Sequence, residues 1–290
     1  MKALVFGGNG RLGQVLVAQL KARNAEVEAP SRADCDLSVR GAALSFVRKS
    51  AATHVFNCAA MSSLEGCADA RDLAMQINAN APFEMALACS EKEIRFVHIS
   101  TDYVLDGELP GMKGETAALK PISVYARSKA EAERAVLDVC PSALVVRVSW
   151  LCGNPSRPAF VEQTVARLVG GEPLSAISDK YSLPTDVEEL APILVDAASA
   201  DLVGVVQACA SGEPVSWHDM AARAVRAARG VRPEISEPVI QRQSLADIPF
   251  FREKRPLHTA MSNARLTDGG FRFSSVDDTI ANAVARFLVK

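Results

Sequence analysis

Short apolar runs alternate with helical patterns along the first half of the chain. The runs that predict buried strands occupy residues 3–6, 26–29, 54–57, 95–99 and 144–148. Between them, helical spacing is found near residues 12–21, 39–49, 78–90 and 124–136. Unbroken apolar strands that alternate with helices predict a parallel sheet covered on both faces. The expected fold is α/β, a Rossmann-like doubly wound sheet with ligands at the carboxyl ends of its strands.

The alternation changes after Trp150, where a loop-like segment with glycine and prolines begins. Further on, one more helix and strand are predicted to rejoin the sheet. The expected division of the chain is a sheet domain at 1–150, rejoined by about 187–210, a smaller and partly discontinuous substrate lobe at 151–186 and 211–275, and a terminal helix at 276–290.

Composition and charge exclude several classes of protein. Hydrophobic residues make up 49% of the chain and the net charge is -2, which gives no electrostatic footprint for nucleic acid or an anionic membrane. The seven cysteines show no C-x-x-C spacing and the four histidines no ligand spacing, which argues against a zinc site. The chain opens directly into a strand, and no apolar run approaches the roughly 20 residues of a membrane helix. We expect a reducing, cytoplasmic location.

A glycine-rich segment follows the first predicted strand and opens the first predicted helix. Gly7, Gly10 and Gly13 give the spacing G-x-x-G-x-x-G. Gly7 would permit the tight turn, Gly10 the close approach of a pyrophosphate, and Gly13 the packing of helix on strand. The pyrophosphate would lie at the helix N-terminus, against free amides. This position predicts an NAD(P)-binding domain at residues 1–150, and the absence of G-K-[ST] excludes a P-loop.

The end of the second predicted strand bears on the choice of cofactor. Ser31 and Arg32 follow it, where NAD-preferring sites usually place an acid for the ribose hydroxyls. Arginine can bind a 2′-phosphate through paired donors, and a solvated surface arginine is the alternative. Asp36 lies just downstream, where it can contact the adenine amine. NADPH is therefore the expected cofactor, with NADH as the second choice.

Tyr125 and Lys129 stand one turn apart on a predicted helix, and Thr101 follows the buried strand at 95–99. With a nicotinamide over this sheet edge, Tyr125 would donate a proton to a substrate carbonyl oxygen as hydride reaches the carbon. Thr101 would hydrogen-bond the same oxygen. The Lys129 ammonium is expected to lower the pKa of Tyr125 from about 10 and to bind the nicotinamide ribose. A surface helix pair is the alternative for Tyr125 and Lys129.

Short motifs spread over nearly all 290 residues are similar to those of one family. They include the glycine loop, Asn57-Cys58-Ala59-Ala60, Ser100-Thr101-Asp102-Tyr103-Val104, Tyr125-x-x-x-Lys129, Arg147-Val148-Ser149-Trp150, Ser178-Asp179-Lys180-Tyr181 and Arg255-Pro256. The chain resembles the extended short-chain dehydrogenase/reductases, specifically the dTDP-4-dehydrorhamnose reductase branch. The resemblance implies NADPH-dependent reduction of the C4 keto group of a dTDP-4-keto-6-deoxyhexose, as in the synthesis of dTDP-L-rhamnose-type sugars.

The resemblance also implies roles for single residues. Thr101, Tyr125 and Lys129 form the implied catalytic set. Asp102 is expected near a sugar hydroxyl, Trp150 as a pocket wall, and Arg255 near the diphosphate or pocket rim. The expected cofactor contacts are Gly7, Asn9, Gly10, Arg11, Leu12, Gly13, Ser31, Arg32, Asp36, Leu37, Cys58, Ala59, Ala60, Asn78, Tyr125 and Lys129. Among them, Asn78 matches an asparagine that helps order the active site. Trp217 is interpreted as a structural loop anchor.

Departures from the family pattern limit what can be said of the substrate. Ala126 stands where the family usually has glycine, and Leu105 replaces a usual phenylalanine. The other departures fall on the expected substrate side, so the sugar stays open. Val15 occupies a position where some members use glutamate to bind a metal at a dimer contact, and we therefore expect no metal. The expected partner is a nucleotide sugar, and the expected assembly a monomer or homodimer.

Two other functions fit the same scaffold. One is a nucleotide-sugar dehydratase or epimerase. Tyr103 stands where a dehydratase would place glutamate after the Thr-Asp pair, and the chain lacks the acid that epimerases usually carry after the second strand. The other is a non-catalytic NADP-binding regulatory subunit, similar to the beta subunit of methionine adenosyltransferase. The intact Thr101, Tyr125 and Lys129 set weighs against this second alternative.

Overall fold

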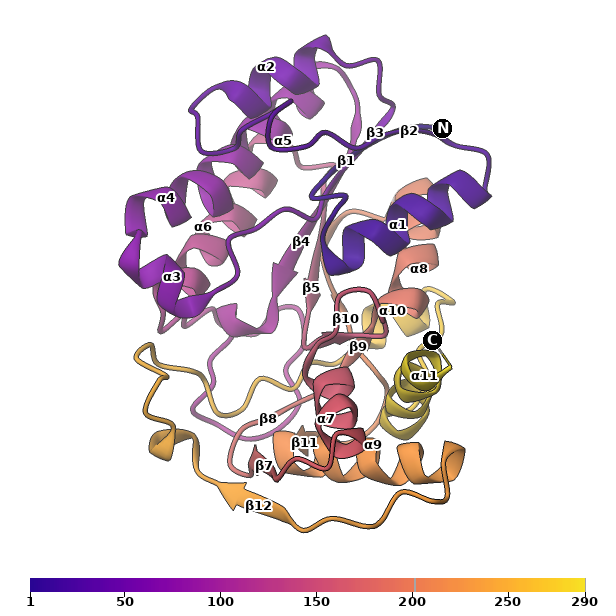
Figure 1. Ribbon diagram of the computed structural model, residues 1–290. Helices are drawn as coiled ribbons and strands as arrows, with labels where there is room; N and C mark the ends of the chain where they lie inside the picture. The colour runs from indigo at the N-terminus through magenta and orange to yellow at the C-terminus, as the bar shows by residue number, and fades with distance from the viewer. Residues whose placement is uncertain (201, 290) are drawn as a thin grey trace.

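The computed structural model describes residues 1–200 and 202–289 and is built around a parallel sheet (Figure 1). Within these residues, six strands form the sheet in the order β2 (Glu26–Glu28), β1 (Lys2–Phe6), β3 (His54–Asn57), β4 (Arg95–Thr101), β5 (Leu144–Val148) and β10 (Gly204–Ala208). Every pairing between neighbours is parallel. The five strands predicted in the first half are all present, and the later strand predicted at 203–208 joins the sheet beside β5.

Helices cover both faces of the sheet, as the apolar strands require. On one face lie α1 (Arg11–Ala22) and α8 (Val187–Ser199), and on the other lie α2 (Ala42–Lys49), α5 (Ala81–Glu91) and α6 (Val124–Val139) (Figure 1). Leu16 and Leu194 pack in the core of the first face, and Met85 and Val136 in that of the second. The predicted α/β doubly wound fold is confirmed.

The order of the strands places a ligand site between β1 and β3. The chain runs from β1 to β2 on one side and then crosses to β3 on the other, so the connections diverge at the carboxyl ends of β1 and β3. Gly7 follows β1 with φ +75°, and a Cβ added there would lie 2.6 Å from the backbone nitrogen of Ala59, which follows β3. Only glycine fits this close approach of the two loops.

Local sequence signals explain where the helices differ from their predicted bounds. The helix predicted from residue 39 begins at Ala42 because Gly41 adopts φ +80°. Two short helices that were not predicted, α3 (Leu64–Asp69) and α4 (Arg71–Met75), precede a π-helical turn (Gln76–Asn80) that runs directly into α5. Ser63 caps α3 by accepting a hydrogen bond from the Gly66 backbone N–H.

A smaller lobe lies beyond the carboxyl end of the sheet (Figure 1). Its helices are α7 (Phe160–Val169), α9 (Trp217–Val231) and α11 (Val276–Leu288), and its short strands are β6 (Leu151–Cys152), β7 (Leu174–Ile177), β8 (Tyr181–Ser182), β9 (Thr185–Asp186), β11 (Val215–Ser216) and β12 (Ile240–Gln243). Helix α10 (Ala264–Asp268) packs near β10. The three longer helices share one core that includes Val165, Ala224 and Ile280. The predicted terminal helix is present as α11, and residue 290 lies outside the described residues.

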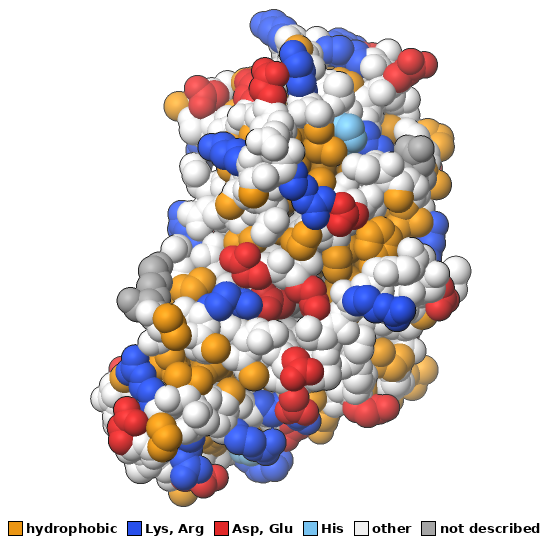
Figure 2. Space-filling view, turned by 90° about the vertical axis from the view of Figure 1, so that its right-hand side faces the viewer, with side chains coloured by type: hydrophobic (Ala, Val, Ile, Leu, Met, Phe, Trp, Pro, Cys, Tyr) orange, Lys and Arg blue, Asp and Glu red, His pale blue; other side chains and the backbone are white. Residues whose placement is uncertain are grey.

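Acidic and basic side chains are intermixed on the face drawn in Figure 2. None of the helices in the described part of the chain has the length and apolar character that crossing a bilayer requires. The seven cysteines there are unpaired thiols. Burial raises the pKa of Cys67 to about 11 and that of Cys58 to about 12, so both thiols stay protonated at neutral pH.

Candidate active site

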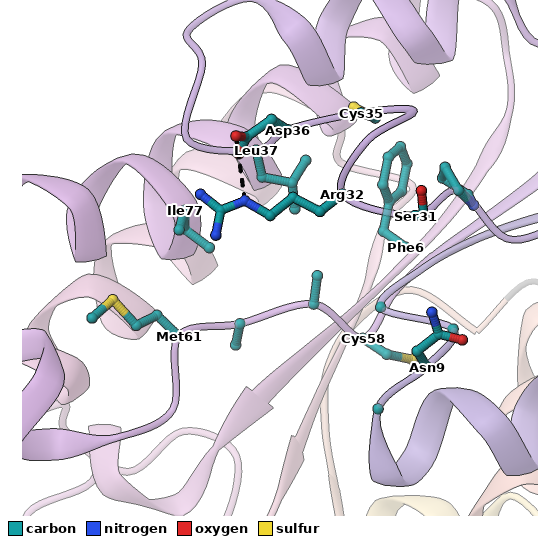
Figure 3. A pocket seen from close by; sticks show the side chains of 16 residues that line it. Phe6, Asn9, Ser31, Arg32, Cys35, Asp36, Leu37, Cys58, Met61 and Ile77 are labelled. Atoms are coloured by element: carbon teal, nitrogen blue, oxygen red, sulfur yellow. Dashed lines mark hydrogen bonds and ion pairs between the residues drawn. The ribbon is translucent and has the colours of Figure 1, made fainter.

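A cavity of about 410 Å³ lies over the carboxyl ends of β1, β2 and β3 (Figure 3). Its lining comes from the glycine loop, the loop after β2 and the loop after β3. The predicted cofactor contacts that line it are Gly7, Asn9, Gly10, Ser31, Arg32, Asp36, Leu37, Cys58, Ala59 and Ala60. Phe6, Cys35, Met61 and Ile77 also line it and were not predicted, because their apolar side chains give no chemical signal in the sequence.

The loop after β2 presents a cation to this cavity. Asp34 fixes the turn by accepting from the backbone N–H and the hydroxyl of Ser31, at 2.8 and 2.7 Å. The Arg32 guanidinium extends across the cavity toward Ile77, with its Nε 3.3 Å from Asp36 Oδ2 (Figure 3). The Arg32 side chain is 76% exposed, so most of its donors remain available to a bound phosphate.

A second cavity, of about 430 Å³, opens beside the first and shares Gly10 and the loop after β3 with it. The three predicted catalytic residues all line this cavity, although they come from β4 and α6. Arg11, Leu12, Asp102 and Trp150 line it as well. The structure therefore brings the expected catalytic set to one place next to the expected cofactor cavity.

Tyr125 lies in the first turn of α6, which Ser123 caps through the backbone N–H of Ala126. A side-chain hydrogen bond with Thr101 lowers the pKa of Tyr125, but desolvation in the cavity wall is larger and raises the value to about 12. The predicted lowering by Lys129 was therefore wrong for this arrangement. The physical reason is the direction of the lysine side chain, which is bound elsewhere.

Lys129 points from α6 toward the strands. Its Nζ lies 2.6 Å from the backbone oxygen of Ile99, to which it donates, and 3.0 Å from Nε2 of His98. The side chain is 1% exposed, and burial lowers its pKa to about 8. Lys129 nevertheless lines the catalytic cavity, so part of its side chain borders the space that a ligand would occupy.

Asp102 lines the catalytic cavity, and both of its carboxylate oxygens also accept hydrogen bonds from protein hydroxyls. Its Oδ2 accepts from the hydroxyls of Ser149 at 3.0 Å, Ser182 at 3.2 Å and Thr259 at 2.5 Å, while Thr101 donates to Oδ1 at 3.2 Å. The residue is 2% exposed. Asp102 thereby ties the end of β4 to the residue after β5, to β8 and to the C-terminal segment, and its expected contact with a sugar hydroxyl stays a prediction.

An aromatic wall, made of Trp150 and residues of the small lobe, lies on one side of the catalytic cavity. Trp150 and Trp217 meet edge to face with ring centroids 5.2 Å apart, and Phe160 packs on Trp217 at the same distance. Trp150 has φ +40°, a strained backbone conformation that is often found at functional sites. The reading of Trp217 as a loop anchor was wrong: it opens α9 and lines the cavity. Its distance of 67 positions from Trp150 hid this pairing in the sequence.

Lys180 supports this wall from behind and was also missed. Its Nζ lies 4.6 Å from the Tyr103 ring centroid and 5.7 Å from that of Trp150, within cation–π range of both. It donates to the backbone oxygen of Pro256 at 2.6 Å. Lys180 is fully buried, which lowers its pKa to about 8. The only sequence signal was its place in a family-like motif.

Three predicted site residues line neither cavity, and a fourth, Arg11, lines the second cavity while its side chain binds backbone oxygens. Arg255 lines neither cavity and pairs with Glu65 of α3. Gly13 lies under the glycine loop, where an added Cβ would be 2.1 Å from the Gly7 oxygen. The Arg11 side chain donates to the backbone oxygens of Arg157 and Pro158, at 2.7 and 3.2 Å.

Asn78 is the third residue that lines neither cavity. Its Oδ1 accepts from the backbone N–H of Met61 at 2.8 Å, and its Nδ2 donates to the Met61 oxygen at 2.9 Å and to Ser128 Oγ at 3.1 Å. Asn78 is fully buried and lines neither cavity, so the expected direct cofactor contact is corrected. It holds the loop after β3 against α6, which is an ordering role.

Comparison with known proteins agrees with this site. A family model described as the RmlD substrate binding domain matches residues 1–289. A dTDP-4-keto-6-deoxy-D-glucose reductase of Streptomyces niveus is 33% identical over 75% of each chain. A dTDP-4-dehydrorhamnose reductase of Mycobacterium tuberculosis is 32% identical over 83% of this chain and 80% of its own.

A solved structure adds the same result for the fold. The crystal structure of a dTDP-4-dehydrorhamnose reductase from Clostridium acetobutylicum superposes with a TM-score of 0.90 at 28% identity, covering 98% of this chain and 99% of that one. The resemblance expected from the motifs is confirmed. The chain therefore belongs to the RmlD substrate binding domain family, that of the dTDP-4-dehydrorhamnose reductases.

Proposed function

We propose that the protein reduces the C4 keto group of a dTDP-4-keto-6-deoxyhexose with NADPH. One observation carries the proposal: Thr101, Tyr125 and Lys129 line one cavity, which shares Gly10 and residues 58–60 with the glycine-loop cavity. A hydride donor in the first cavity and a carbonyl in the second would meet at their shared wall. The two relatives reported above are named as reductases of dTDP-linked keto sugars, which supports the same substrate class.

The donor set of the first cavity fits a phosphorylated dinucleotide. Gly7, Gly10 and the N-terminus of α1 would hold the pyrophosphate, since the two glycines line the cavity and have no side chains, and the first backbone amides of a helix are free to bind an anion. Arg32 and Ser31 would hold a 2′-phosphate at the end of β2. When bound there, NADPH supplies the hydride that reduces the carbonyl carbon.

Residues of the protein itself would donate the proton to the substrate and hold the sugar in position. Tyr125 has a pKa near 12 and is therefore protonated at neutral pH, which makes it the acid that gives a proton to the developing alkoxide oxygen. Thr101 would donate a hydrogen bond to the same oxygen. Trp150 and Trp217 would pack against the sugar ring and exclude water. A Lys129 ammonium turned into the cavity would stabilise the Tyr125 phenolate left after proton transfer.

Dehydration and epimerisation are less well supported. The residue after Asp102 is Tyr103, a phenol where dehydration needs a carboxylate, and burial raises its pKa further, so it stays protonated at neutral pH. The non-catalytic alternative has no feature of the cavity in its favour. We also propose that residues 1–150 and 187–210 bind the cofactor and that 151–186 and 211–275 bind the nucleotide sugar. The proposed assembly is a monomer or homodimer in a reducing compartment.

The proposal is tested by following NADPH absorbance with an enzymatically prepared dTDP-4-keto-6-deoxy sugar. The wild-type protein should oxidise NADPH only when the sugar is present. Tyr125→Phe should lower kcat by about 10²–10⁴-fold, because it removes the proton donor and leaves the ring in place. NADP⁺ binding by this variant, measured by calorimetry, should stay close to wild type. Full activity of Tyr125→Phe, or no oxidation by the wild type, would contradict the proposal.

A further inference from the structure

Three buried polar side chains from three elements form a hydrogen-bonded row beside the catalytic cavity. Asn57 ends β3, and its register partner on β4 is His98, so the two side chains lie next to each other on one face of the sheet. Lys129 reaches the same face from α6. The three residues are each at most 1% exposed. Asn57 and His98 have no part in the chemistry described so far.

The orientation of the Asn57 amide sets the tautomer of His98. The backbone N–H of Ala59 donates to Asn57 Oδ1 over 3.1 Å, so the amide NH₂ is the group that faces His98 Nδ1, also at 3.1 Å. Nδ1 then accepts, and a neutral imidazole assigned from this network carries its one proton on Nε2. Nε2 is the nitrogen 3.0 Å from Lys129 Nζ. Lys129 is thus approached by an N–H group.

Because His98 presents an N–H group to Lys129, this direction of the hydrogen bonds favours the neutral amine form of Lys129. An amine can accept from the His98 Nε2–H and donate to the Ile99 oxygen at 2.6 Å, which satisfies both contacts. An ammonium has no lone pair, so two N–H groups would face each other. Reversing the row by turning the Asn57 amide would leave the Ala59 N–H without its acceptor.

The surroundings of Lys129 shift its pKa in opposite directions. Burial lowers the pKa of Lys129, whereas Glu133 on α6 and Cys58 after β3 raise it. Burial, followed by the nearby Lys129 charge, holds the pKa of His98 well below its usual value, so the imidazole stays neutral at pH 7. The hydrogen-bond row therefore works in the same direction as desolvation.

We propose that Asn57 and His98 are positioning residues that hold Lys129 as a neutral amine and release it as an ammonium toward the cavity it lines. The inference rests on the proposed reductase function, where the ammonium is the form that assists Tyr125. Lys129 then has two states, an amine bonded to His98 and an ammonium in the catalytic cavity. Activity falls as pH rises and the amine bonded to His98 becomes the dominant state.

The wild-type protein tests the tautomer directly, without any substrate. In ¹⁵N-histidine NMR at pH 7, the His98 signal should show a protonated Nε2 and an unprotonated Nδ1. The loss of this signal in His98→Gln assigns it. The ¹³Cε signal of Lys129, assigned by its loss in Lys129→Arg, should titrate well below the lysines on the surface. A protonated Nδ1, or a Lys129 that titrates with the surface lysines, would overturn the inference.

The Asn57→Asp variant should reverse the direction of the hydrogen bonds between residue 57, His98 and Lys129, and it provides the functional test. Its carboxylate can accept from both the Ala59 N–H and His98 Nδ1–H, which moves the imidazole proton to Nδ1 and leaves Nε2 free to accept from an ammonium. The titration of Lys129 and the alkaline limb of kcat/KM should both move up by about one pH unit or more. His54→Asn is the matched control, because His54 lies at the opposite end of β3 from Asn57. The pH profile of this variant should be the same as that of the wild type.

The outcomes separate this inference from the proposed function. If the wild type shows the expected His98 tautomer but reduces no dTDP-linked keto sugar, the proposed function is contradicted and the inference about the hydrogen bonds is still supported. If the enzyme is active but Asn57→Asp changes neither the titration of Lys129 nor the alkaline limb of kcat/KM, the inference about the hydrogen bonds is contradicted and the proposed function still stands. Should Asn57→Asp fail to fold, the wild-type NMR measurement still decides the inference.

Discussion

Arg255 and Glu65 form a two-pronged ion pair that joins the segment after β12 to α3. Nη1 lies 2.9 Å from Oε1 and Nη2 lies 3.1 Å from Oε2, while the guanidinium stacks on Phe251 at 3.5 Å from the ring centroid. In Figure 1 this orange segment runs up the lower left of the molecule toward α3. Because the first residue of α3, Leu64, lines the catalytic cavity, the pair fixes one edge of the site.

Arg255→Met should destabilise the protein by about 1–3 kcal/mol, because it removes two charge-assisted hydrogen bonds at a pair that is largely buried. The KM for the sugar should rise more than the KM for NADPH. Arg252→Met is the matched control: its pair with Asp69 has side chains 61% and 58% exposed, so its loss should destabilise the protein far less. Urea unfolding of both variants measures the difference, and equal losses would contradict the prediction.

The Arg255–Glu65 pair should also make stability depend on acid pH. Arg255 holds the pKa of Glu65 below its ordinary value of 4.5. A carboxyl with a lowered folded-state pKa stabilises the fold above its unfolded-state pKa, and this stabilisation is lost as pH falls through the folded-state value. Wild type should therefore lose more stability between pH 6 and pH 3 than Glu65→Gln does. Parallel urea curves for the two proteins across this range would contradict the prediction.

Substitution of Asp102 distinguishes a structural role of this residue from a direct contact with the sugar. Asp102→Asn should lower the free energy of unfolding by about 1–3 kcal/mol, since an NH₂ would replace an oxygen that accepts several buried hydroxyl hydrogen bonds. Thr259→Val, which removes one of those donors, should have a smaller effect of about 1 kcal/mol. An Asp102→Asn variant of wild-type stability with a raised KM for the sugar alone would instead support a direct substrate contact.

Gly13 and Gly10 should respond differently to the same added methyl group. A Cβ at Gly13 would lie 2.1 Å from the Gly7 backbone oxygen, so Gly13→Ala should displace the loop and destabilise the fold by about 1–3 kcal/mol or more. A Cβ at Gly10 would lie 3.1 Å from the same oxygen, a tight contact that a small shift relieves, so Gly10→Ala should lower the melting temperature much less than Gly13→Ala does. It should bind NADPH more weakly, however, because the methyl group faces the cofactor cavity. Thermal unfolding and calorimetry distinguish the two.

Arg32 should determine the preference for NADPH. Arg32→Ala should raise the KM for NADPH by about 10- to 100-fold, since a charge-assisted bond to a phosphate contributes roughly 1.5–3 kcal/mol. The KM for NADH should change little. Arg40→Ala is a suitable control, because Arg40 is exposed nearby and does not line the cavity. An equal change in both KM values would show that Arg32 has a general role.

The sequence predicted the sheet and the reacting groups because both leave local signals. The apolar run at 95–99 was enough to place β4, and Tyr125 with Lys129 needed only helical spacing. The bounds of α5 were harder, since the π-helical turn at Gln76–Asn80 depends on packing against α6. Helix α9 was missed because its segment lies in a region rich in charge, although Ser216 and Asp219 form a capping box at its start.

By itself, the sequence determined the α/β class, the glycine loop and the chemical types of the catalytic residues, because these depend on period, turn chemistry and side-chain identity. Tertiary structure decided what each polar group faces. Asp102 meets Thr259 across 157 positions, and Lys129 turns to His98 instead of Tyr125. Local spacing carries no information on such contacts, since they arise only when distant elements pack and bury their polar atoms together.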